Sequence, residues 1–259
     1  ALQAHDFARG AGGQFRLRIE DIDGTRCRDV HRIGIFEDLR WLGLDWDGDV
    51  MVQSERMPAY AAALERLDRL GLIYRCTCTR ADIAAAASAP QGQAVTLYPG
   101  TCRLRALPAD TPVPWCWRLN VSAALALTGP LDWEDESGAR MEADPAALGD
   151  AVLARKDAGT SYHLSVVVDD AAQGITDVVR GRDLRDATHL HRLLQALLGY
   201  PTPRYHHHRL VVGHDGERLA KRKGAPTLAA LRDSGVDPAD LIENMRHGRF
   251  PVGFGLEEE

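Results

Sequence analysis

The stretch GDAVLARKDAGTSYHLSVVVDDAAQGITDVVRGRDLRDATHLHRLLQALLG, residues 149–199, decides the fold class of this chain. Residues 149–155 and 175–181 are short apolar runs typical of strands, and residues 187–199 carry a helical apolar pattern that ends in a glycine. The run between the strands, residues 161–174, leaves helix and strand open. Strands that alternate with helices predict an α/β domain on an open, mainly parallel sheet, with ligands at the carboxyl ends of its strands.

The first part of the chain has the same alternation. Residues 2–11 follow helical spacing, residues 14–21 alternate as a strand does, and residues 29–42 return to helical spacing. Ser54 as an N-cap and Gly71 as a C-terminal stop enclose a further amphipathic helix. These segments therefore predict the first half of the same sheet domain.

The segment between the two α/β parts differs in composition. It contains an alanine run, two nearby tryptophans in PWCWRLNV and the turn-rich GPLDWEDESG, which together predict a small mixed insertion. We therefore divide the chain into a first half of the α/β domain at residues 1–75, an inserted subdomain at 76–149, a second half of the α/β domain at 150–226 and a helical C-terminal segment at 227–259.

Composition limits the class of protein. The chain has 259 residues, 45% of them hydrophobic and 26% charged, as is usual for a soluble globular protein. No apolar run approaches the roughly 20 residues of a membrane span, and none resembles a signal peptide, so we expect a cytoplasmic protein without membrane contact. The net charge of −6 argues against a protein that coats nucleic acid, so an RNA contact must be local.

Cys76, Cys78 and Cys102 cluster in the sequence, and the odd total of five cysteines argues against a complete disulfide framework. Zinc prefers four ligands in a tetrahedron and binds thiolates well, so the three cysteines predict three of its ligands. Tyr98, a water molecule or an acidic residue could complete the site. The alternative is three unrelated buried thiols.

Two other stretches place polar groups where strands are expected to end. In FRLRIEDIDGTR, Glu20 and the aspartates after it could hold an ammonium group, or they could form an exposed turn. In the later stretch, Tyr162 precedes an expected strand with Arg180 near its end. A guanidinium there could bind a carboxylate through two parallel hydrogen bonds, or it could pair with Asp183 on the surface.

The stretch HDGERLAKRKGAPTL, residues 214–228, concentrates the cations Arg218, Lys221, Arg222 and Lys223. It follows an expected strand, has glycines on both sides, and precedes a helical pattern with a proline near its start. Such a loop can contact phosphates and stabilise the charge of a nucleotidyl-transfer transition state. A solvated turn is the alternative.

Taken in order, these stretches resemble the class I aminoacyl-tRNA synthetases of the glutamyl branch. RLAKR, residues 218–222, resembles the KMSKS loop, and LRIEDIDGTR is similar to the R-x-E-D-T-D motif. YHLSVVVDD followed by GITDVVRG resembles the branch's Y-H-L-x-x-V-V-D-D and G-V-T-D-V-I-R-G segment. The resemblance spans almost the whole chain. It implies a class I Rossmann-type parallel sheet with helices on both faces, interrupted by a small zinc-binding α+β insertion and followed by a short helical C-terminal segment.

Within this branch the chain is most similar to the short paralogues, the glutamyl-queuosine tRNA(Asp) synthetases. Little sequence follows the basic loop, so we expect no anticodon-binding domain. Val166 stands where longer glutamate enzymes have asparagine, and C-x-C with Y-x-x-x-C resembles the paralogues' metal site. The resemblance implies one structural Zn²⁺ per chain, bound by Cys76, Cys78, Tyr98 and Cys102.

The resemblance also implies a reaction and residue roles. A monomeric enzyme activates glutamate with ATP and Mg²⁺, and passes the glutamyl group to the queuosine base at the wobble position of tRNA(Asp). Glu20 binds the α-ammonium group, Tyr162 lines the glutamate pocket, and Arg180 pairs with the side-chain carboxylate. Lys221 is the catalytic contact to the ATP phosphates. Positioning and electrostatics then carry the reaction without a general base.

Two departures from the family pattern bear on activity. Arg218 and Ala220 replace a lysine and a serine of the KMSKS loop. The H-I-G-H motif is expected before Ala1, because ALQAHDFAR resembles the rest of the helix that it opens. If the natural protein lacked it, adenylation would be severely impaired. A fragment of glutamyl-tRNA synthetase and a catalytically silent tRNA-binding relative are the alternative interpretations.

Overall fold

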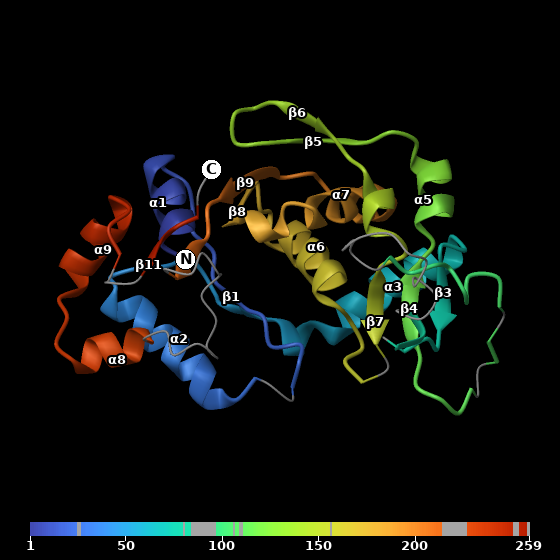
Figure 1. The fold of residues 1–259 in the computed structure, drawn as a ribbon, viewed down its shortest axis with the longest axis horizontal. Helices are drawn as coiled ribbons and strands as arrows, with labels where there is room; N and C mark the ends of the chain where they lie inside the picture. The colour runs from blue at the N-terminus through green and yellow to red at the C-terminus, as the bar shows by residue number, and fades with distance from the viewer. Residues whose placement is uncertain are drawn as a thin grey trace. The chain divides into compact units, whose positions relative to one another are not determined.

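The computed structural model of the chain describes residues 1–24, 27–79, 81–83, 97–105, 107–108, 111–155, 157–213, 227–250 and 254–257. The chain forms two compact units, and each combines segments that are far apart in the sequence (Figure 1). Unit 1 consists of Ala1–Met51, Val179–Leu184 and His206–Glu259, and unit 2 consists of Val52–Val178 and Arg185–Tyr205.

Unit 1 contains short strands and the first and last helices of the described chain. Its elements are α1 (Leu2–Gly10), β1 (Arg18–Ile19), α2 (Asp29–Trp41), η3 (Arg182–Leu184), β10 (Val211–Gly213), α8 (Leu228–Asp233), α9 (Pro238–Arg246) and β11 (Phe254–Leu256). β2 (Met51–Val52), β8 (Asp177–Gly181) and β9 (Arg204–His208) each contain residues of both units. β1 pairs with β2, β8 with β9, and β10 with β11.

The expected strand at residues 14–21 shows the predicted alternation of buried and exposed side chains. Its hydrogen-bonded part, β1, is only two residues long. Phe15 and Ile19 are buried, whereas Gln14 and Glu20 are exposed. The Phe15 carbonyl accepts a hydrogen bond from the Asp47 amide at 2.8 Å, which extends the contact beyond β1 itself. The strand's apolar side thus faces the interior of unit 1, as its sequence predicts.

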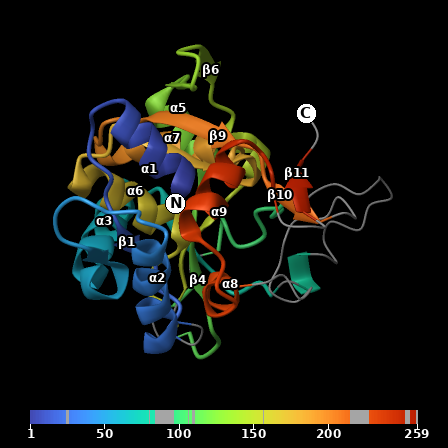
Figure 2. The ribbon, with the colours of Figure 1, turned by 90° about the vertical axis from the view of Figure 1, so that its left-hand side faces the viewer.

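Helix α2 forms where helical spacing predicts it, but its expected apolar face is largely exposed. Val30 and Ile33 are 65% and 55% exposed, and Leu39 is the buried residue of this helix. Leu39 packs with Leu44 and Ile242 in the core of unit 1. Helix α8, from the last chain segment of unit 1, contacts α2 (Figure 2).

Unit 2 contains the longest stretch of continuous chain. Its elements are η1 (Gln53–Arg56), α3 (Met57–Arg69), β3 (Ile73–Cys76), β4 (Cys116–Leu119), α5 (Val121–Thr128), β5 (Asp132–Glu134), β6 (Arg140–Glu142), η2 (Pro145–Leu148), β7 (Val152–Arg155), α6 (Tyr162–Gln173) and α7 (Ala187–Leu198). β3, β4 and β7 form an antiparallel sheet with β4 in the middle, and β5 and β6 form an antiparallel hairpin.

The N-cap prediction at Ser54 is wrong. Ser54 lies inside the 3₁₀ turn η1, and α3 begins at Met57 with Pro58 in its first turn. Proline suits the first turn of a helix because its fixed φ is already helical and its missing N–H needs no partner there. The predicted stop is confirmed, since Gly71 follows the helix with a φ of +69°.

The ambiguous run at residues 161–174 is a helix, α6. It ends at Gly174 and α7 ends at Gly199, both in the left-handed conformation that glycine adopts without a steric cost. α6 and α7 contact each other and α3. Leu164 and Leu190 are fully buried, and burial of such a side chain contributes about 1.5–3 kcal/mol to stability.

The chain is an α/β protein, as its sequence predicts, with short strands between helices. Across the described residues, no helix combines the length and apolar character that crossing a membrane requires.

Candidate functional site

The predicted metal ligands lie together in unit 2. The thiol sulfurs of Cys76, Cys78 and Cys102 are all within 4.8 Å of one another. The Tyr98 hydroxyl lies 3.3 Å from the Cys76 sulfur and 3.8 Å from the Cys78 sulfur. Cys76 is the last residue of β3, and Cys102 and Tyr98 are buried beside it. Residues more than 20 positions apart in sequence are thus brought into one cluster, which we call the thiol cluster.

The Tyr98 side chain is held in place from two sides. Its hydroxyl accepts a hydrogen bond from the Cys102 amide at 2.7 Å, and the Arg118 guanidinium lies 3.9 Å from the centre of its ring. Burial raises the pKa of the Tyr98 hydroxyl. Arg118 is itself buried and donates a hydrogen bond to the Asp150 carbonyl at 2.7 Å.

The thiols differ in acidity. A hydrogen bond with Cys116, and weaker ones with Tyr98 and Arg118, lower the pKa of the Cys76 thiol to about 4 in spite of its burial. Burial raises the pKa of the Cys78 thiol to about 11. Metal ligands must lose their protons, so a cation bound here would release protons from the remaining groups.

The donor set of the thiol cluster fits a zinc ion. Three thiols and a phenol within contact distance supply four donors, and the Cys78 and Cys102 sulfurs are 3.6 Å apart. Ligands at the usual Zn–S distance of about 2.3 Å lie roughly 3.8 Å from one another in a tetrahedron. The spacing of the thiols therefore needs little adjustment to accept a tetrahedral metal.

Glu20 lies directly after β1 in unit 1, and its carboxylate is 3.4 Å from the Arg18 guanidinium. The Glu20 side chain is 43% exposed, so the carboxylate reaches solvent. The position at the end of a strand is the one that the sequence predicts.

Arg180 lies in β8, also in unit 1, one residue before the strand ends. Its Nε atom is 3.3 Å from Nε2 of His207, which lies in β9. The paired strand β9 thus contributes a side chain that orients the guanidinium. The sequence alone gives His207 no such role, because the pairing of β8 with β9 is what brings it to Arg180.

Tyr162 is the first residue of α6 in unit 2. Its ring packs edge-on against His163 and at a tilt against His191. The two imidazoles form a hydrogen bond of 3.1 Å between Nδ1 of His163 and Nε2 of His191. His163 also lines a cavity of about 320 Å³. Tyr98 and Arg118, which lie at the thiol cluster, line the same cavity.

Asp169, in α6, is buried, and the sequence alone does not distinguish it from its neighbour Asp170. Its carboxylate is fully buried and accepts hydrogen bonds from Gln53 at 2.9 Å, Arg56 at 2.6 Å and Tyr60 at 2.8 Å. These donors come from η1 and α3, so Asp169 fixes α6 against them. It thereby positions the helix that begins with Tyr162.

The basic loop with Arg218, Lys221, Arg222 and Lys223 lies outside the described residues. The strand that leads into it, β10, lines a cavity of about 420 Å³ in unit 1. The start of α1 and residues of α9 line the same cavity. A cavity is therefore present at the strand before the loop.

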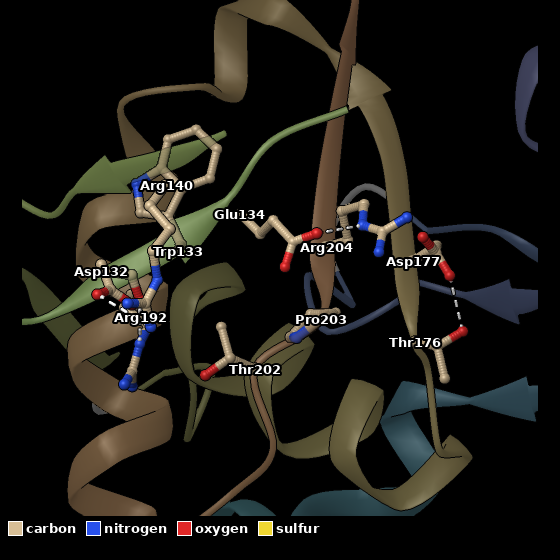
Figure 3. A pocket seen from close by; sticks show the side chains of 10 residues that line it. All are labelled: Asp132, Trp133, Glu134, Arg140, Thr176, Asp177, Arg192, Thr202, Pro203 and Arg204. Carbon is tan, nitrogen blue, oxygen red and sulfur yellow. Dashed lines mark hydrogen bonds and ion pairs between the residues drawn. The ribbon is translucent and has the colours of Figure 1, made fainter. Parts of the chain in front are cut away.

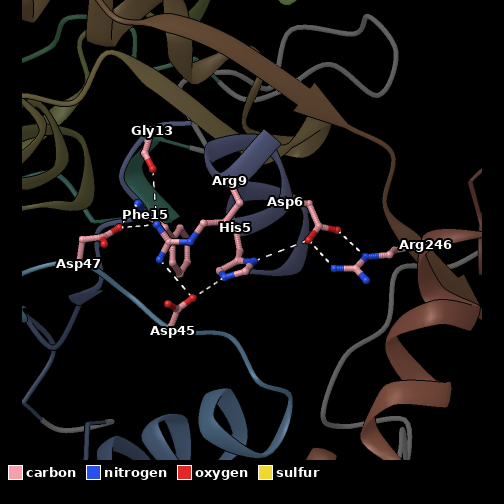
Figure 4. Close-up of polar contacts among 8 residues, drawn as sticks. All are labelled: His5, Asp6, Arg9, Gly13, Phe15, Asp45, Asp47 and Arg246. Carbon is pink, nitrogen blue, oxygen red and sulfur yellow. Dashed lines mark hydrogen bonds and ion pairs between the residues drawn. The ribbon is translucent and has the colours of Figure 1, made fainter. Parts of the chain in front are cut away.

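A cluster of charged side chains fixes α1 within unit 1 (Figure 4). His5 and Arg9 contact Asp45 at 2.9 and 3.1 Å, and Arg9 also contacts Asp47 at 2.7 Å. Asp47 in turn accepts a hydrogen bond from the Phe15 amide at 2.8 Å. Asp47 therefore holds both the helix and the segment that leads into β1.

A cavity of about 350 Å³ in unit 2 is lined by charged residues of the β5–β6 hairpin, α7 and the segments where β8 and β9 begin (Figure 3). Arg204 pairs with Glu134 at 3.0 Å, and Thr176 donates a hydrogen bond to Asp177 at 2.8 Å. Glu20, Tyr162 and Arg180 are not among the residues that line this cavity.

Comparison with known proteins places the chain in a family. Residues 1–253 match the family described as tRNA synthetases class I (E and Q), catalytic domain. Proteins named glutamyl-Q tRNA(Asp) synthetase are similar to the chain. The one from Rhodobacter capsulatus is 49% identical over 255 residues, which cover 93% of this chain and 91% of the relative. The one from Symbiobacterium thermophilum is 43% identical and covers 95% and 80%.

The fold is similar to that of a solved glutamate-tRNA synthetase from Elizabethkingia anophelis. The TM-score is 0.73 at 24% sequence identity, and the match covers 93% of this chain and 56% of that chain. The class I α/β fold that the sequence predicts is thereby confirmed. The chain belongs to the class I tRNA synthetases of the E and Q type, a family of ligases.

Proposed function

We propose that the chain activates glutamate with ATP and transfers the glutamyl group to the queuosine base at the wobble position of tRNA(Asp). The observation that carries this proposal is the 49% identity, over 93% of the chain, to a protein named glutamyl-Q tRNA(Asp) synthetase. The chain spans about half the length of the glutamate-tRNA synthetase with a similar fold. Relatedness thus favours modification of a base over charging of tRNA(Glu).

Three residues are proposed to bind glutamate. Glu20 would hold the α-ammonium group, and Arg180 would bind the side-chain carboxylate through its fork of N–H groups. Tyr162 would line the pocket. The solvent-reaching carboxylate of Glu20 and the contact of Arg180 with His207 support these roles.

The reaction would proceed in two displacements. A carboxylate oxygen of glutamate attacks the α-phosphorus of ATP, the bond to the β-phosphate breaks, and pyrophosphate leaves with its electrons. A nucleophilic group of the queuosine base then attacks the glutamyl carbonyl carbon, and AMP leaves. Lys221 and the Mg²⁺ that accompanies ATP would stabilise the negative charge on the phosphates.

The thiol cluster is proposed to hold one Zn²⁺ through Cys76, Cys78, Tyr98 and Cys102. Four protein ligands close the coordination sphere, so the ion would stabilise the fold without meeting substrate. We also propose that residues 76–149 are an inserted subdomain organised around this ion, and that the protein is a monomer.

Two assays test the proposed reaction. The protein should exchange labelled pyrophosphate into ATP with glutamate present and no tRNA. It should then attach labelled glutamate to tRNA(Asp) that carries queuosine, but not to queuosine-free tRNA(Asp) or to tRNA(Glu). Labelling of the acceptor end of tRNA(Glu) would overturn the proposal in favour of a glutamyl-tRNA synthetase, and tRNA binding without exchange would favour a silent relative.

Lys221 can be tested separately. We expect Lys221→Ala to reduce pyrophosphate exchange about 100-fold or more, because one positive charge at the phosphates is lost. Lys156→Ala is the matched control, since it removes a lysine outside the basic loop. Unchanged exchange in Lys221→Ala would return the loop to the interpretation of a solvated turn.

A further inference from the structure

The thiol cluster has more donors than a tetrahedral ion can use. Besides Tyr98 and the three clustered cysteines, Cys116 packs against the same buried group. We propose that Cys116 is a reserve metal ligand, which takes the fourth coordination position when Tyr98 does not fill it. This proposal rests on the proposed zinc site.

The strand register places Cys116 beside a ligand. Cys116 and Cys76 are direct partners in the antiparallel ladder of β3 and β4. Side chains at such positions lie on the same face of the sheet, with their Cβ atoms about 4.5–5.5 Å apart. Cys116 does not belong to the group of sulfurs within 4.8 Å, but it borders that group through Cys76.

The Cys116 side chain has the rotational freedom to turn toward the proposed ion. The position of the sulfur is set by one torsion angle with three staggered states, so a rotamer change moves it without a change in the backbone. Cys116 is half-buried at the first position of β4, next to the connecting segment and away from the strand's fully buried end.

The exchange also preserves charge and suits the metal. Three thiolates and one phenolate carry the same formal charge as four thiolates, so Arg118 beside the cluster would meet the same net charge in both ligand sets. The Cys116 proton would pass to solvent when the thiolate binds. Zinc is found in closed sites with four cysteines, whereas tyrosine is an uncommon ligand.

The test compares four proteins: the wild type, Tyr98→Phe, Cys116→Ser and the double variant. Metal analysis should find one zinc per chain in the first three, while the double variant should bind zinc about 100-fold or more weakly in competition with a chelating dye. In the cobalt-substituted proteins, the sulfur-to-cobalt charge-transfer absorption should be about one third stronger in Tyr98→Phe than in the wild type, because four thiolates replace three.

Alkylation with iodoacetamide gives a readout that does not depend on the double variant's folding. Cys116 should react in the zinc-loaded wild type and be protected in zinc-loaded Tyr98→Phe, as judged by mass spectrometry. Cys27→Ser is the control, because Cys27 is an exposed cysteine of unit 1, and its loss should change no metal readout.

Two results would overturn the reserve role: loss of zinc from Tyr98→Phe alone, or equal zinc affinity in Tyr98→Phe and the double variant. The first would mean that Cys116 does not replace the phenolate, and the second that water does. A wild type without zinc would instead refute the proposed zinc site. Failure of the two proposals is therefore distinguishable.

Discussion

Arg180 is followed by a glycine, Gly181, whose surroundings are closely packed. A Cβ atom at Gly181 would lie 2.5 Å from Oδ1 of Asp183 and 2.7 Å from Cδ2 of Leu210, both shorter than real contacts of such atoms. Both atoms are the ends of flexible side chains, so a larger residue at position 181 would displace these side chains. The end of β8 is thus closely packed beside Arg180, while His207 contacts the Arg180 side chain.

Replacement of Arg180 by lysine tests the proposed carboxylate contact. We expect Arg180→Lys to lower kcat/KM for glutamate about 10- to 100-fold, because lysine keeps the charge but loses the planar pair of donors. Pyrophosphate exchange at varied glutamate concentration measures the change. Arg155→Lys, at an exposed arginine of β7, is the control and should leave kcat/KM as it is.

Individual site residues differed in how well the sequence could predict them. The thiol cluster is recognisable because cysteine and tyrosine at fixed spacings restrict the ligand set, and the structure brings those side chains together. Asp169 was not recognisable, because its partners lie more than 100 residues earlier in the chain and the adjacent Asp170 has the same chemistry. Burial of one acid and not the other is decided by tertiary packing.

Asp169→Asn should be strongly destabilising. Asparagine has the same shape but no charge, and its amide N–H groups would face the donors of Gln53, Arg56 and Tyr60. We expect a loss of about 3 kcal/mol in the free energy of unfolding, measured by urea titration. Asp157→Asn, at an exposed aspartate, should change it by less than about 0.5 kcal/mol.

At the scale of elements, α1 and α9 are joined by one bidentate ion pair. Arg246 donates to both carboxylate oxygens of Asp6, at 2.9 and 2.7 Å (Figure 4). The hydrogen bond and charge of Arg246 hold the pKa of Asp6 below its usual value of 3.8. The carboxylate form is therefore favoured in the folded protein.

This pair should make stability depend on pH. A carboxyl group whose pKa is lowered by folding stabilises the protein above its ordinary pKa, and this contribution is lost as the pH falls through the lowered value. We expect Asp6→Asn to lose less than about 1 kcal/mol at pH 7 and to converge with the wild type in acid. Urea titrations at pH 7, 5 and 3 measure the convergence. A constant difference across that range would contradict the assignment.

The elements and some helix C-terminal ends were predictable, whereas the start of α3 and the buried face of α2 were not. Glycines in the left-handed conformation end α3 and α7 where the sequence predicts helix ends. The apolar spacing of α2 did not identify its buried face, because Val30 and Ile33 are mostly exposed in the described part of the chain. The N-cap at Ser54 failed because Pro58 sets the first turn. Local residues such as glycine and proline determine where a helix begins and ends, whereas tertiary packing determines which of its faces is buried.

At the scale of the whole molecule, the chain crosses between units several times. Unit 1 gathers three separate segments around α1, β8 and α9, whereas unit 2 contains the sheet that carries the thiol cluster. The division of the catalytic domain into halves around an insertion at residues 76–149 stays a prediction. The apolar periodicity of a segment predicts whether it forms a helix or a strand. It does not predict which distant segment it packs against, so the composition of the two units could not be derived from it.

Removal of the proposed zinc should affect one unit. We expect a chelator to reduce protection from hydrogen exchange at the amides of β3 and β4, because both strands end in the thiol cluster or beside it. Amides of α1 and α9, in unit 1, serve as the internal control and should keep their protection. Equal loss in both units would contradict a local structural role for the ion.

The segmented composition of the units has a consequence for synthesis on the ribosome. Unit 2 is complete once Tyr205 has left the exit tunnel, but unit 1 still lacks Arg232 and Arg246, which pair with Asp38 and Asp6 near the other end of the chain. Because domains fold as their residues emerge, unit 2 can form first while α1 and α2 wait for their partners. During that interval residues 1–51 remain exposed to chaperones and proteases.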